Sequence, residues 1–311
     1  MAKILITESV HPIGPELLTA AGHTVVYADR DMDVIRREIV DADAVLVRII
    51  ELPGSLLATA KNLKIVSKHG VGYDNIDLDY CKNHGVAVTI TPNANSLSVA
   101  EHAFTLMLTL AKNIIPVSNE YRTVGFAAKN HAPGIEMTGK TLGLIGMGRI
   151  GKHILHMCRD GLDMHVIVYD PYISEVPEGV EKVDDLSELL RRADVVTLHC
   201  LLTDETRKLI DRERLALMKP TALLINCARG PIVDEAALIE ALESGRLAGA
   251  GLDVTDPEPV APDSPLFKLP NVIVTPHYAP TTVESATRVS KIAAENINAV
   301  LAGQEPVGRI V

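Results

Sequence analysis

Short apolar runs alternate with amphipathic stretches along most of this chain. Five such runs in the first part are rich in β-branched residues and predict strands at 3–7, 24–28, 44–48, 64–70 and 86–90. The segments between them have the composition and spacing of helices. Runs that are apolar throughout, and that alternate with helices, are typical of a parallel sheet covered on both faces. We therefore expect a doubly wound α/β lobe that ends near residue 96.

A second alternating series begins at Lys140. It predicts strands at 141–146, 164–170, 194–200, 221–227, 249–255 and 271–277. The segment 283–303 has apolar residues at helical spacing, and no strand follows it, so it could pack back on the first lobe. The predicted domains are residues 1–96 with 283–311, and residues 97–282.

The segment 96–113 lies between the two series and is apolar nearly all round, so we expect a helix buried on several sides. Ser98 followed by Glu101 has the spacing of a capping box and predicts the start of this helix. Such a helix could form a contact between lobes, between subunits, or both.

Composition limits the classes of function. The chain is 47% hydrophobic and 23% charged, which is ordinary for a globular protein, and its net charge of -10 argues against a nucleic-acid partner. No segment is long and apolar enough to predict a membrane span or a signal peptide. The four cysteines are scattered, which is typical of free thiols in a cytoplasmic protein. Because the net charge is negative, an anionic ligand would need a local cluster of hydrogen-bond donors to hold it.

A dinucleotide-binding fingerprint occurs in the second series. Gly146, Gly148 and Gly151 form a GxGxxG motif between a predicted strand and a predicted helix, and Asp170 follows the next strand at the expected spacing. The glycines let the backbone approach a pyrophosphate, and Asp170 would accept hydrogen bonds from ribose hydroxyls. Because its carboxylate would repel a 2′-phosphate, the sequence favours NAD over NADP.

Charged side chains follow three predicted strands of the same lobe: Arg229, Glu258 and His277. Ligands of open α/β sheets bind outside the carboxyl ends of the strands, so these residues can converge at the mouth of one cleft. In the first lobe, a glycine-flanked turn can present the amides of Val71 and Gly72 to an anion.

Arg48, Lys68 and His69 lie at strand ends of the first lobe. Any of them could bind a substrate phosphate, and any could equally be a solvated loop charge. Arg48 is the candidate that we retain. His153, His156 and Cys158 lie close together on one helix, but no second ligand cluster accompanies them, so we expect no metal.

Six ordered motifs carry a family resemblance over nearly the whole chain: HGVGYDNID, TPNANSLSVAE, GKTLGLIGMGRIGK, NCARGPIVDEAAL, GLDVTDPEP and TPH. The sequence resembles the D-isomer-specific 2-hydroxyacid dehydrogenases, and within them the 3-phosphoglycerate dehydrogenases. The resemblance implies a flavodoxin-like substrate domain, a Rossmann NAD domain with a cleft between them, and a homodimer built on the SVAEHAFTLMLTL region.

The resemblance also implies residue roles. Arg229 would bind the substrate carboxylate, His277 would exchange the proton, and Glu258 would orient His277. Asp253 resembles a residue that helps to hold the nicotinamide. The remaining residues expected to contact the cofactor are Arg149, Ile150 and Cys227.

The sequence departs from the family pattern at two places. HCLL at His199 stands where many members have His-x-Pro-Leu, and Tyr278 and Pro280 replace small residues after His277. The chain ends soon after the last helix, so we expect no separate regulatory domain and no serine feedback through one. Two alternatives stay open: a glyoxylate or hydroxypyruvate reductase, and an NAD-sensing binding protein similar to the C-terminal-binding corepressors.

Overall fold

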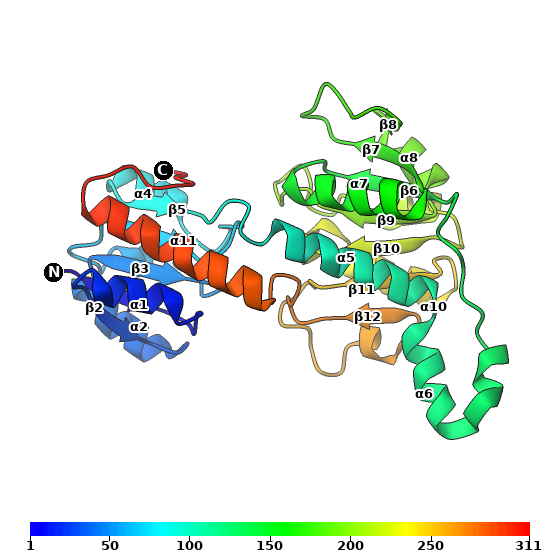
Figure 1. Cartoon of the computed structure of the whole chain (residues 1–311), viewed down its shortest axis with the longest axis horizontal. Helices are drawn as coiled ribbons and strands as arrows, with labels where there is room; N and C mark the ends of the chain where they lie inside the picture. Colours follow the sequence, from blue (N-terminus) through cyan, green and yellow to red (C-terminus); the bar gives the residue numbers. More distant parts are fainter. The chain divides into compact units, whose positions relative to one another are not determined.

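A computed structural model describes all 311 residues, which divide into two compact units: residues 1–95 with 280–311 form unit 1, and residues 96–279 form unit 2. Each unit contains one parallel sheet with helices on both faces, as Figure 1 shows, and this confirms the predicted doubly wound α/β class. No helix combines the length and the apolar character that crossing a bilayer requires.

Unit 1 is built on a five-stranded sheet in the order β2-β1-β3-β4-β5, which is the flavodoxin-like order. Its strands are β1 (Lys3–Ile6), β2 (Thr24–Tyr27), β3 (Ala44–Val47), β4 (Ile65–Lys68) and β5 (Ala87–Thr89). Its helices are α1 (Ile13–Ala20), α2 (Met32–Glu38), η1 (Ile39–Asp41), α3 (Gly54–Leu57), α4 (Leu78–Asn83) and α11 (Val283–Leu301).

The C-terminal helix α11 packs on this N-terminal sheet beside α1 (Figure 1). Its apolar side contributes Ala293 and Ile297 to a core with Ile4 and Leu46, all fully buried. Ser67 on β4 donates a hydrogen bond of 3.0 Å to the Ala293 carbonyl. Unit 1 is therefore built from two segments that are far apart in the sequence.

Unit 2 is built on a seven-stranded sheet in the order β12-β11-β10-β9-β6-β7-β8. Its strands are β6 (Thr141–Ile145), β7 (His165–Tyr169), β8 (Val180–Lys182), β9 (Val195–Leu198), β10 (Leu223–Asn226), β11 (Gly249–Leu252) and β12 (Val272–Val274). Its helices are α5 (Ser96–Ala111), α6 (Ile114–Val124), η2 (Gly125–Asn130), α7 (Arg149–Leu162), α8 (Leu186–Arg192), α9 (Arg212–Leu217), η3 (Gly230–Ile232), α10 (Glu235–Glu243) and η4 (Pro265–Lys268).

The order of this sheet reverses at β6, which pairs with β7 on one side and with β9 on the other. Helices α5 and α7 bury one face, and α8, α9 and α10 bury the other. Ligands of such sheets bind at the carboxyl ends of the strands next to this reversal. The loops that follow β6, β9, β10, β11 and β12 all lie at that edge.

One local prediction was wrong. Helix α5 begins at Ser96, so Ser98 lies inside its first turn and is not the N-cap of a capping box. The preceding turn, with Asn93 in the left-handed region (φ 64°), ends before Ser96. Because the helix can start directly after that turn, the pairing of Ser98 with Glu101 does not mark its beginning.

Candidate active site

In the glycine loop after β6, neighbouring backbone lies too close to Gly146 and Gly151 to leave room for a side chain. Gly146 has a φ of 90°, and a β-carbon there would lie 2.8 Å from the Cys200 amide nitrogen. A β-carbon on Gly151 would lie 2.3 Å from the Gly146 carbonyl oxygen. Gly148, by contrast, has nothing within 4 Å of the position of a β-carbon.

The open face at Gly148 lies at the N-terminus of α7, a helix of 14 residues whose first-turn amides have no intrahelical partner. Arg149 is exposed and Ile150 half-buried in that first turn. This arrangement leaves room for a pyrophosphate and presents donors to it. The chain therefore fits a dinucleotide at this position.

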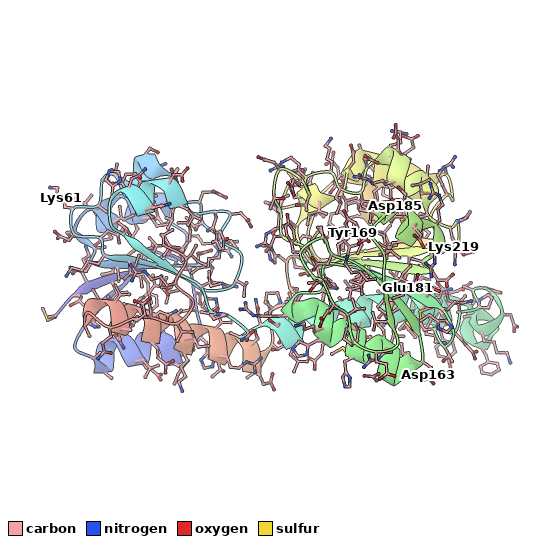
Figure 2. The ribbon with its side chains drawn as sticks, turned by 90° about the horizontal axis from the view of Figure 1, so that it is seen from above. Lys61, Asp163, Tyr169, Glu181, Asp185 and Lys219 are labelled. Atoms are coloured by element: carbon pink, nitrogen blue, oxygen red, sulfur yellow. The ribbon has the colours of Figure 1, made fainter.

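Asp170 follows β7 and is joined to the glycine loop. Asp163 caps the C-terminus of α7 and Tyr169 is the last residue of β7 (both are labelled in Figure 2), and Asp170 is the next residue. Its carboxylate accepts hydrogen bonds from the amides of Met147 (2.9 Å) and Tyr172 (3.0 Å). The Tyr172 hydroxyl donates to Glu205 (3.1 Å), which brings a second carboxylate to this surface.

We predict that Asp170→Ala weakens NAD binding and narrows the preference for NAD over NADP, because an acceptor for ribose hydroxyls and a charge repelling a 2′-phosphate are lost together. Equilibrium titration of both cofactors measures the effect. Glu205→Gln is the matched variant, since it removes a neighbouring charge without touching the Met147 amide. A wild-type preference for NADP would contradict this interpretation of Asp170.

Arg229 follows β10 on a backbone that its neighbours hold in place. The Asn226 side chain donates to the Arg229 carbonyl (2.9 Å) and accepts from the Ala228 amide (3.0 Å). The guanidinium is half-buried and donates to the Ala228 carbonyl at 2.7 Å. A β-carbon on Gly230 would lie 1.9 Å from the Thr255 carbonyl oxygen, so this turn packs tightly on the loop after β11.

That loop brings Glu258 to His277. His277 Nδ1 lies 2.7 Å from Glu258 Oε1, and the two side chains keep 32% and 40% of their surface exposed. The loop itself is held by the Thr255 hydroxyl, which donates to the Pro257 carbonyl (2.9 Å), and by Glu235, which accepts from the Asp256 amide (2.9 Å). Because Nδ1–H donates to Glu258, Nε2 is the atom that remains to exchange a proton.

Asp253 is buried between the strand ends and binds the loop that carries His277. It accepts hydrogen bonds from the Thr275 hydroxyl (2.6 Å) and from the amides of Tyr278 (2.7 Å) and Ala279 (2.9 Å). Burial alone would raise the pKa of the Asp253 carboxyl, but the hydrogen bonds from His102, Thr275 and the two amides hold it below its usual value. Asp253 is therefore an ionised internal acceptor.

Cys227 follows β10 and is buried. Burial, together with the nearby Asp253 carboxylate, raises the pKa of its thiol well above the usual value, so it stays a neutral thiol at physiological pH. Among His153, His156 and Cys158, His156 bonds to Asp160 (2.6 Å) and Cys158 is buried. The structure has no group of three or more metal-ligating side chains placed for a metal ion.

In unit 1 the predicted anion-binding turn lies directly after β4. The amides of Val71 and Gly72 donate no hydrogen bond to the protein, so both are available to a ligand. Arg48 is half-buried at the end of β3, and its guanidinium donates to the Ser9 carbonyl at 2.9 Å. The buried Glu8 accepts from the amides of Arg48 and Ile49 and so holds this strand end.

The other two unit 1 candidates have different environments. The Lys68 ammonium group is buried and donates to the Arg48 carbonyl and to the Asn75 side chain (2.6 Å). Burial, reinforced by the charge of Arg48, lowers the pKa of His69 to about 3, so this imidazole is neutral at physiological pH. A neutral His69 brings no positive charge to a phosphate.

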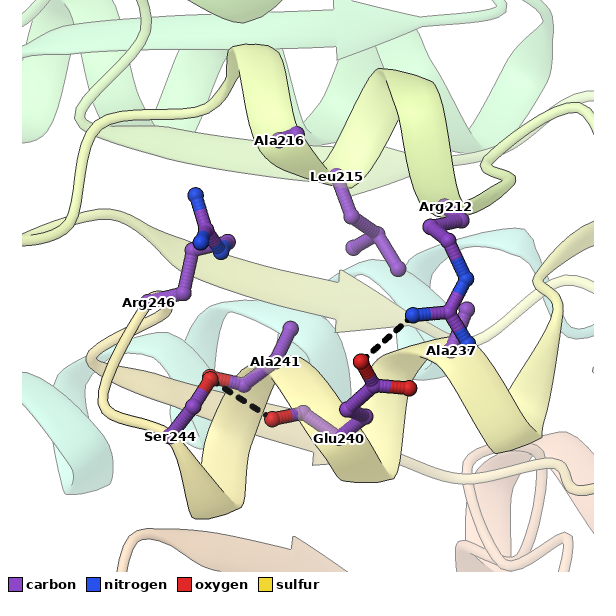
Figure 3. A pocket seen from close by; sticks show the side chains of 8 residues that line it. All are labelled: Arg212, Leu215, Ala216, Ala237, Glu240, Ala241, Ser244 and Arg246. Atoms are coloured by element: carbon purple, nitrogen blue, oxygen red, sulfur yellow. Dashed lines mark hydrogen bonds and ion pairs between the residues drawn. The ribbon is translucent and has the colours of Figure 1, made fainter.

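A pocket of about 260 Å³ lies elsewhere in unit 2, between α9 and α10 (Figure 3). It is lined by Leu215 and Ala241 among other apolar residues, with Arg212 paired to Glu240 (2.5 Å) at one side. None of the predicted site residues lines it, so this pocket is separate from the site described above.

Sequence reasoning missed four residues that support the site. Asn226 and Glu235 hold the loops of Arg229 and Glu258, and His102 and Thr275 contact Asp253. A polar Asn226 at the end of an otherwise apolar run was a usable signal. No sequence signal marked His102 as a functional residue, because a single histidine in an apolar helix is more often a core residue with its hydrogen bonds satisfied.

Comparison with known proteins shows which family the chain resembles. Residues 104–279 match the family model described as "D-isomer specific 2-hydroxyacid dehydrogenase, NAD binding domain". Among curated relatives, the D-3-phosphoglycerate dehydrogenase of Methanocaldococcus jannaschii is 42% identical over 98% of this chain and 58% of its own length. The glyoxylate reductase of Thermofilum pendens is 38% identical over 98% of this chain and 93% of its own length.

Solved structures give the same class. The TT0316 protein from Thermus thermophilus superposes with a TM-score of 0.91 at 35% identity, covering 99% of this chain and all of its own. An NADPH-dependent glyoxylate/hydroxypyruvate reductase from Sinorhizobium meliloti, solved with NADP and malonate, gives 0.90 at 28% identity, covering all of this chain and 97% of its own.

The fold and the glycine loop define an NAD-binding protein of the doubly wound α/β class. The chain belongs to the D-isomer-specific 2-hydroxyacid dehydrogenase family, and unit 2 contains the NAD-binding domain of that family. The chain spans just over half the length of the phosphoglycerate dehydrogenases that it matches.

Proposed function

We propose that this protein is an NAD-dependent oxidoreductase that interconverts a D-2-hydroxy acid and its 2-oxo acid. The contact of 2.7 Å between His277 and Glu258 is the observation that carries the proposal. It lies at the carboxyl edge of β11 and β12, in the sheet that carries the glycine loop. Strand β11 pairs with β10, which Arg229 follows, and β12 pairs with β11. An acid–base pair beside a cation and a dinucleotide loop suits hydride transfer to a carbonyl carbon.

Each residue has a distinct role in this proposal. The nicotinamide, when bound, supplies or accepts the hydride. Arg229 binds the substrate carboxylate and polarises the 2-oxo group, a task that suits a planar guanidinium. His277 Nε2 gives its proton to the carbonyl oxygen during reduction and takes it back during oxidation. Glu258 orients the ring through Nδ1 and stabilises the imidazolium.

The remaining predicted contacts belong to the same proposal. Gly146, Gly148, Arg149, Ile150 and Gly151 surround the pyrophosphate, with Asp170 on the ribose. Cys227 and Asp253 are assigned to the nicotinamide end. Unit 1 is proposed as the substrate domain.

In that substrate domain, the Val71 and Gly72 amides are assigned to an anionic group of the substrate, because neither amide has a protein partner. Arg48 is assigned to the same task because its guanidinium lies at a strand end.

The proposed substrate is 3-phosphoglycerate or a similar small acid. The motifs TPNANSLSVAE and NCARGPIVDE and the 42% identity to a phosphoglycerate dehydrogenase support it. Glyoxylate or hydroxypyruvate reduction is the second candidate, because the glyoxylate reductase relative matches over 93% of its own length.

NADH oxidation with a panel of 2-oxo acids tests the reaction and separates the candidates. The panel contains 3-phosphohydroxypyruvate, hydroxypyruvate, glyoxylate and pyruvate, and D- and L-hydroxy acids are compared in the reverse direction with NAD. We expect turnover with at least one 2-oxo acid and a preference for the D isomer. Cofactor binding without turnover on any acid would instead support an NAD-sensing binding protein.

We also propose a homodimer. The predicted region lies on α5, and α6 and η2 form an adjoining arm (Figure 1). Helix α6 has no buried residue. The arm exposes large apolar side chains, among them Tyr121 (59%) and Phe126 (72%). An exposed apolar surface of this kind is typical of an interface between subunits.

We also propose a cytoplasmic location, which the four free cysteines support.

We predict that replacing both Tyr121 and Phe126 with glutamate shifts the protein towards the monomer, because two charges would be buried in the proposed interface. Light scattering over a range of concentrations measures the change. Phe267→Glu is the matched control, since Phe267 is 54% exposed elsewhere in unit 2. A monomeric wild type, or a dimer that the double variant leaves intact, would exclude this interface.

A further inference from the structure

A hydrogen-bonded cluster lies directly behind the loop that carries His277. His102, from α5, places Nε2 3.0 Å from Thr275 Oγ1 and 3.4 Å from Asp253 Oδ1. Thr275 Oγ1 lies 2.6 Å from the same carboxylate oxygen. His102 keeps 17% of its side-chain surface exposed and Asp253 only 1%, so their mutual contacts are sheltered from water.

The donors and acceptors of the cluster determine which ring nitrogen of His102 is protonated. Asp253 is ionised, because its hydrogen bonds outweigh burial and lower its pKa. A carboxylate can only accept, so the single hydroxyl proton of Thr275 lies in the short contact with Asp253. The Thr275 oxygen must then act as acceptor towards His102. His102 Nε2 therefore carries the proton.

The cluster connects to the backbone on both sides of His277. The amide of His277 donates to the Asp253 carbonyl (2.8 Å), and those of Tyr278 and Ala279 donate to the Asp253 carboxylate (2.7 and 2.9 Å). His277 itself is in the left-handed region, with a φ of 53°. A non-glycine residue adopts that conformation when its surroundings hold it there.

We propose that His102 is a positioning residue for His277. By donating from Nε2, it fixes Thr275 and Asp253, and Asp253 fixes the backbone that presents the His277 ring to Glu258. The inference rests on the proposed function for its catalytic meaning, because it deepens the role of His277 in that reaction. The protonation of His102 and the placement of the His277 ring are testable without any substrate.

The first experiment is a long-range ¹H–¹⁵N spectrum of histidine-labelled protein at mildly alkaline pH, with signals assigned by single variants. We expect His102 in the tautomer protonated at Nε2. We also expect the His277 ring signals to shift in His102→Leu, which has no donor, and to return in His102→Gln, whose amide nitrogen can replace Nε2. A His102 protonated at Nδ1 alone, or His277 signals insensitive to His102→Leu, would overturn the proposal.

The second experiment measures steady-state kinetics with the best 2-oxo acid of the panel. We expect His102→Leu to lower kcat about tenfold to hundredfold, because a misplaced proton donor slows the chemical step. KM for the oxo acid should change little, since Arg229 is held independently by Asn226. His102→Gln should recover most of kcat. A loss that glutamine does not restore, or a change in KM alone, would indicate a merely structural role.

A double-variant cycle tests the connection through Thr275. Thr275→Val should lower kcat as His102→Leu does, and combining them should add little, because both break the same chain of hydrogen bonds. Additive losses would overturn the connection. Thr105→Val is the matched control, since it removes a hydrogen bond within α5 to Glu101 without reaching Asp253. If the wild type turns over no acid, the proposed function fails, while the spectra still decide the positioning role.

Discussion

Arg229→Ala is expected to lower kcat/KM for 2-oxo acid reduction by about a thousandfold or more. Losing one preorganised donor to a developing oxyanion costs roughly a hundredfold to a thousandfold, and here the carboxylate contact is lost as well. Cofactor affinity should barely change, because the glycine loop lies at another strand end. The measurement is kcat/KM together with the Kd for NADH.

Two further variants sharpen this test. Arg229→Lys keeps the positive charge but loses the planar pair of donors, so it should recover little activity. Arg246→Ala is the control, because this exposed arginine of unit 2 lines the separate pocket between α9 and α10. Turnover near that of the wild type in Arg229→Ala would refute the proposed role.

His277→Asn is expected to reduce kcat by about a hundredfold to ten-thousandfold, the usual contribution of a positioned acid–base group. Asparagine suits this position because it tolerates a positive φ better than most residues, and its amide can still donate to Glu258. The variant therefore removes the exchangeable proton while keeping the loop. His165→Asn, an exposed histidine on β7, is the control. Unchanged kcat in His277→Asn would exclude His277 as the proton donor.

Glu258→Gln separates orientation from charge. It keeps the shape of the side chain but removes the negative charge beside the imidazolium. Because the equilibrium of the reaction fixes the ratio of kcat/KM in the two directions at a given pH, both values should fall together in Glu258→Gln. Glu258→Ala also removes the hydrogen bond to His277 Nδ1, so it should lower kcat/KM further, and the difference between the two variants measures the contribution of orientation. A Glu258→Gln variant as active as the wild type would show that Glu258 acts through orientation alone.

Several features were predictable because they depend on residues close together in the sequence or on a general rule of sheets. The spacing of Gly146, Gly148 and Gly151 reflects backbone contacts within one turn. Apolar runs separated by helices indicated both parallel sheets, since only buried strands can be apolar throughout. The rule that ligands bind at carboxyl strand ends indicated Arg229 and His277 from their positions along the chain alone.

Other features were decided only by packing between distant segments. His102 reaches Thr275 across 173 residues, and only the packing of α5 against β11 and β12 sets that distance. From the sequence, Lys68 could have been a phosphate ligand or a solvated loop charge, yet its buried ammonium group donates to Asn75 inside unit 1.

What the sequence by itself determined is the class of fold, the dinucleotide loop and the residues at the strand ends. Local propensity and periodicity encode those features directly. The tertiary structure decided which polar groups share hydrogen bonds and where the protons in them lie, as His102, Asp253 and Thr275 illustrate. Such partnerships depend on distances of a few ångströms between elements, and no pattern along one chain specifies those distances.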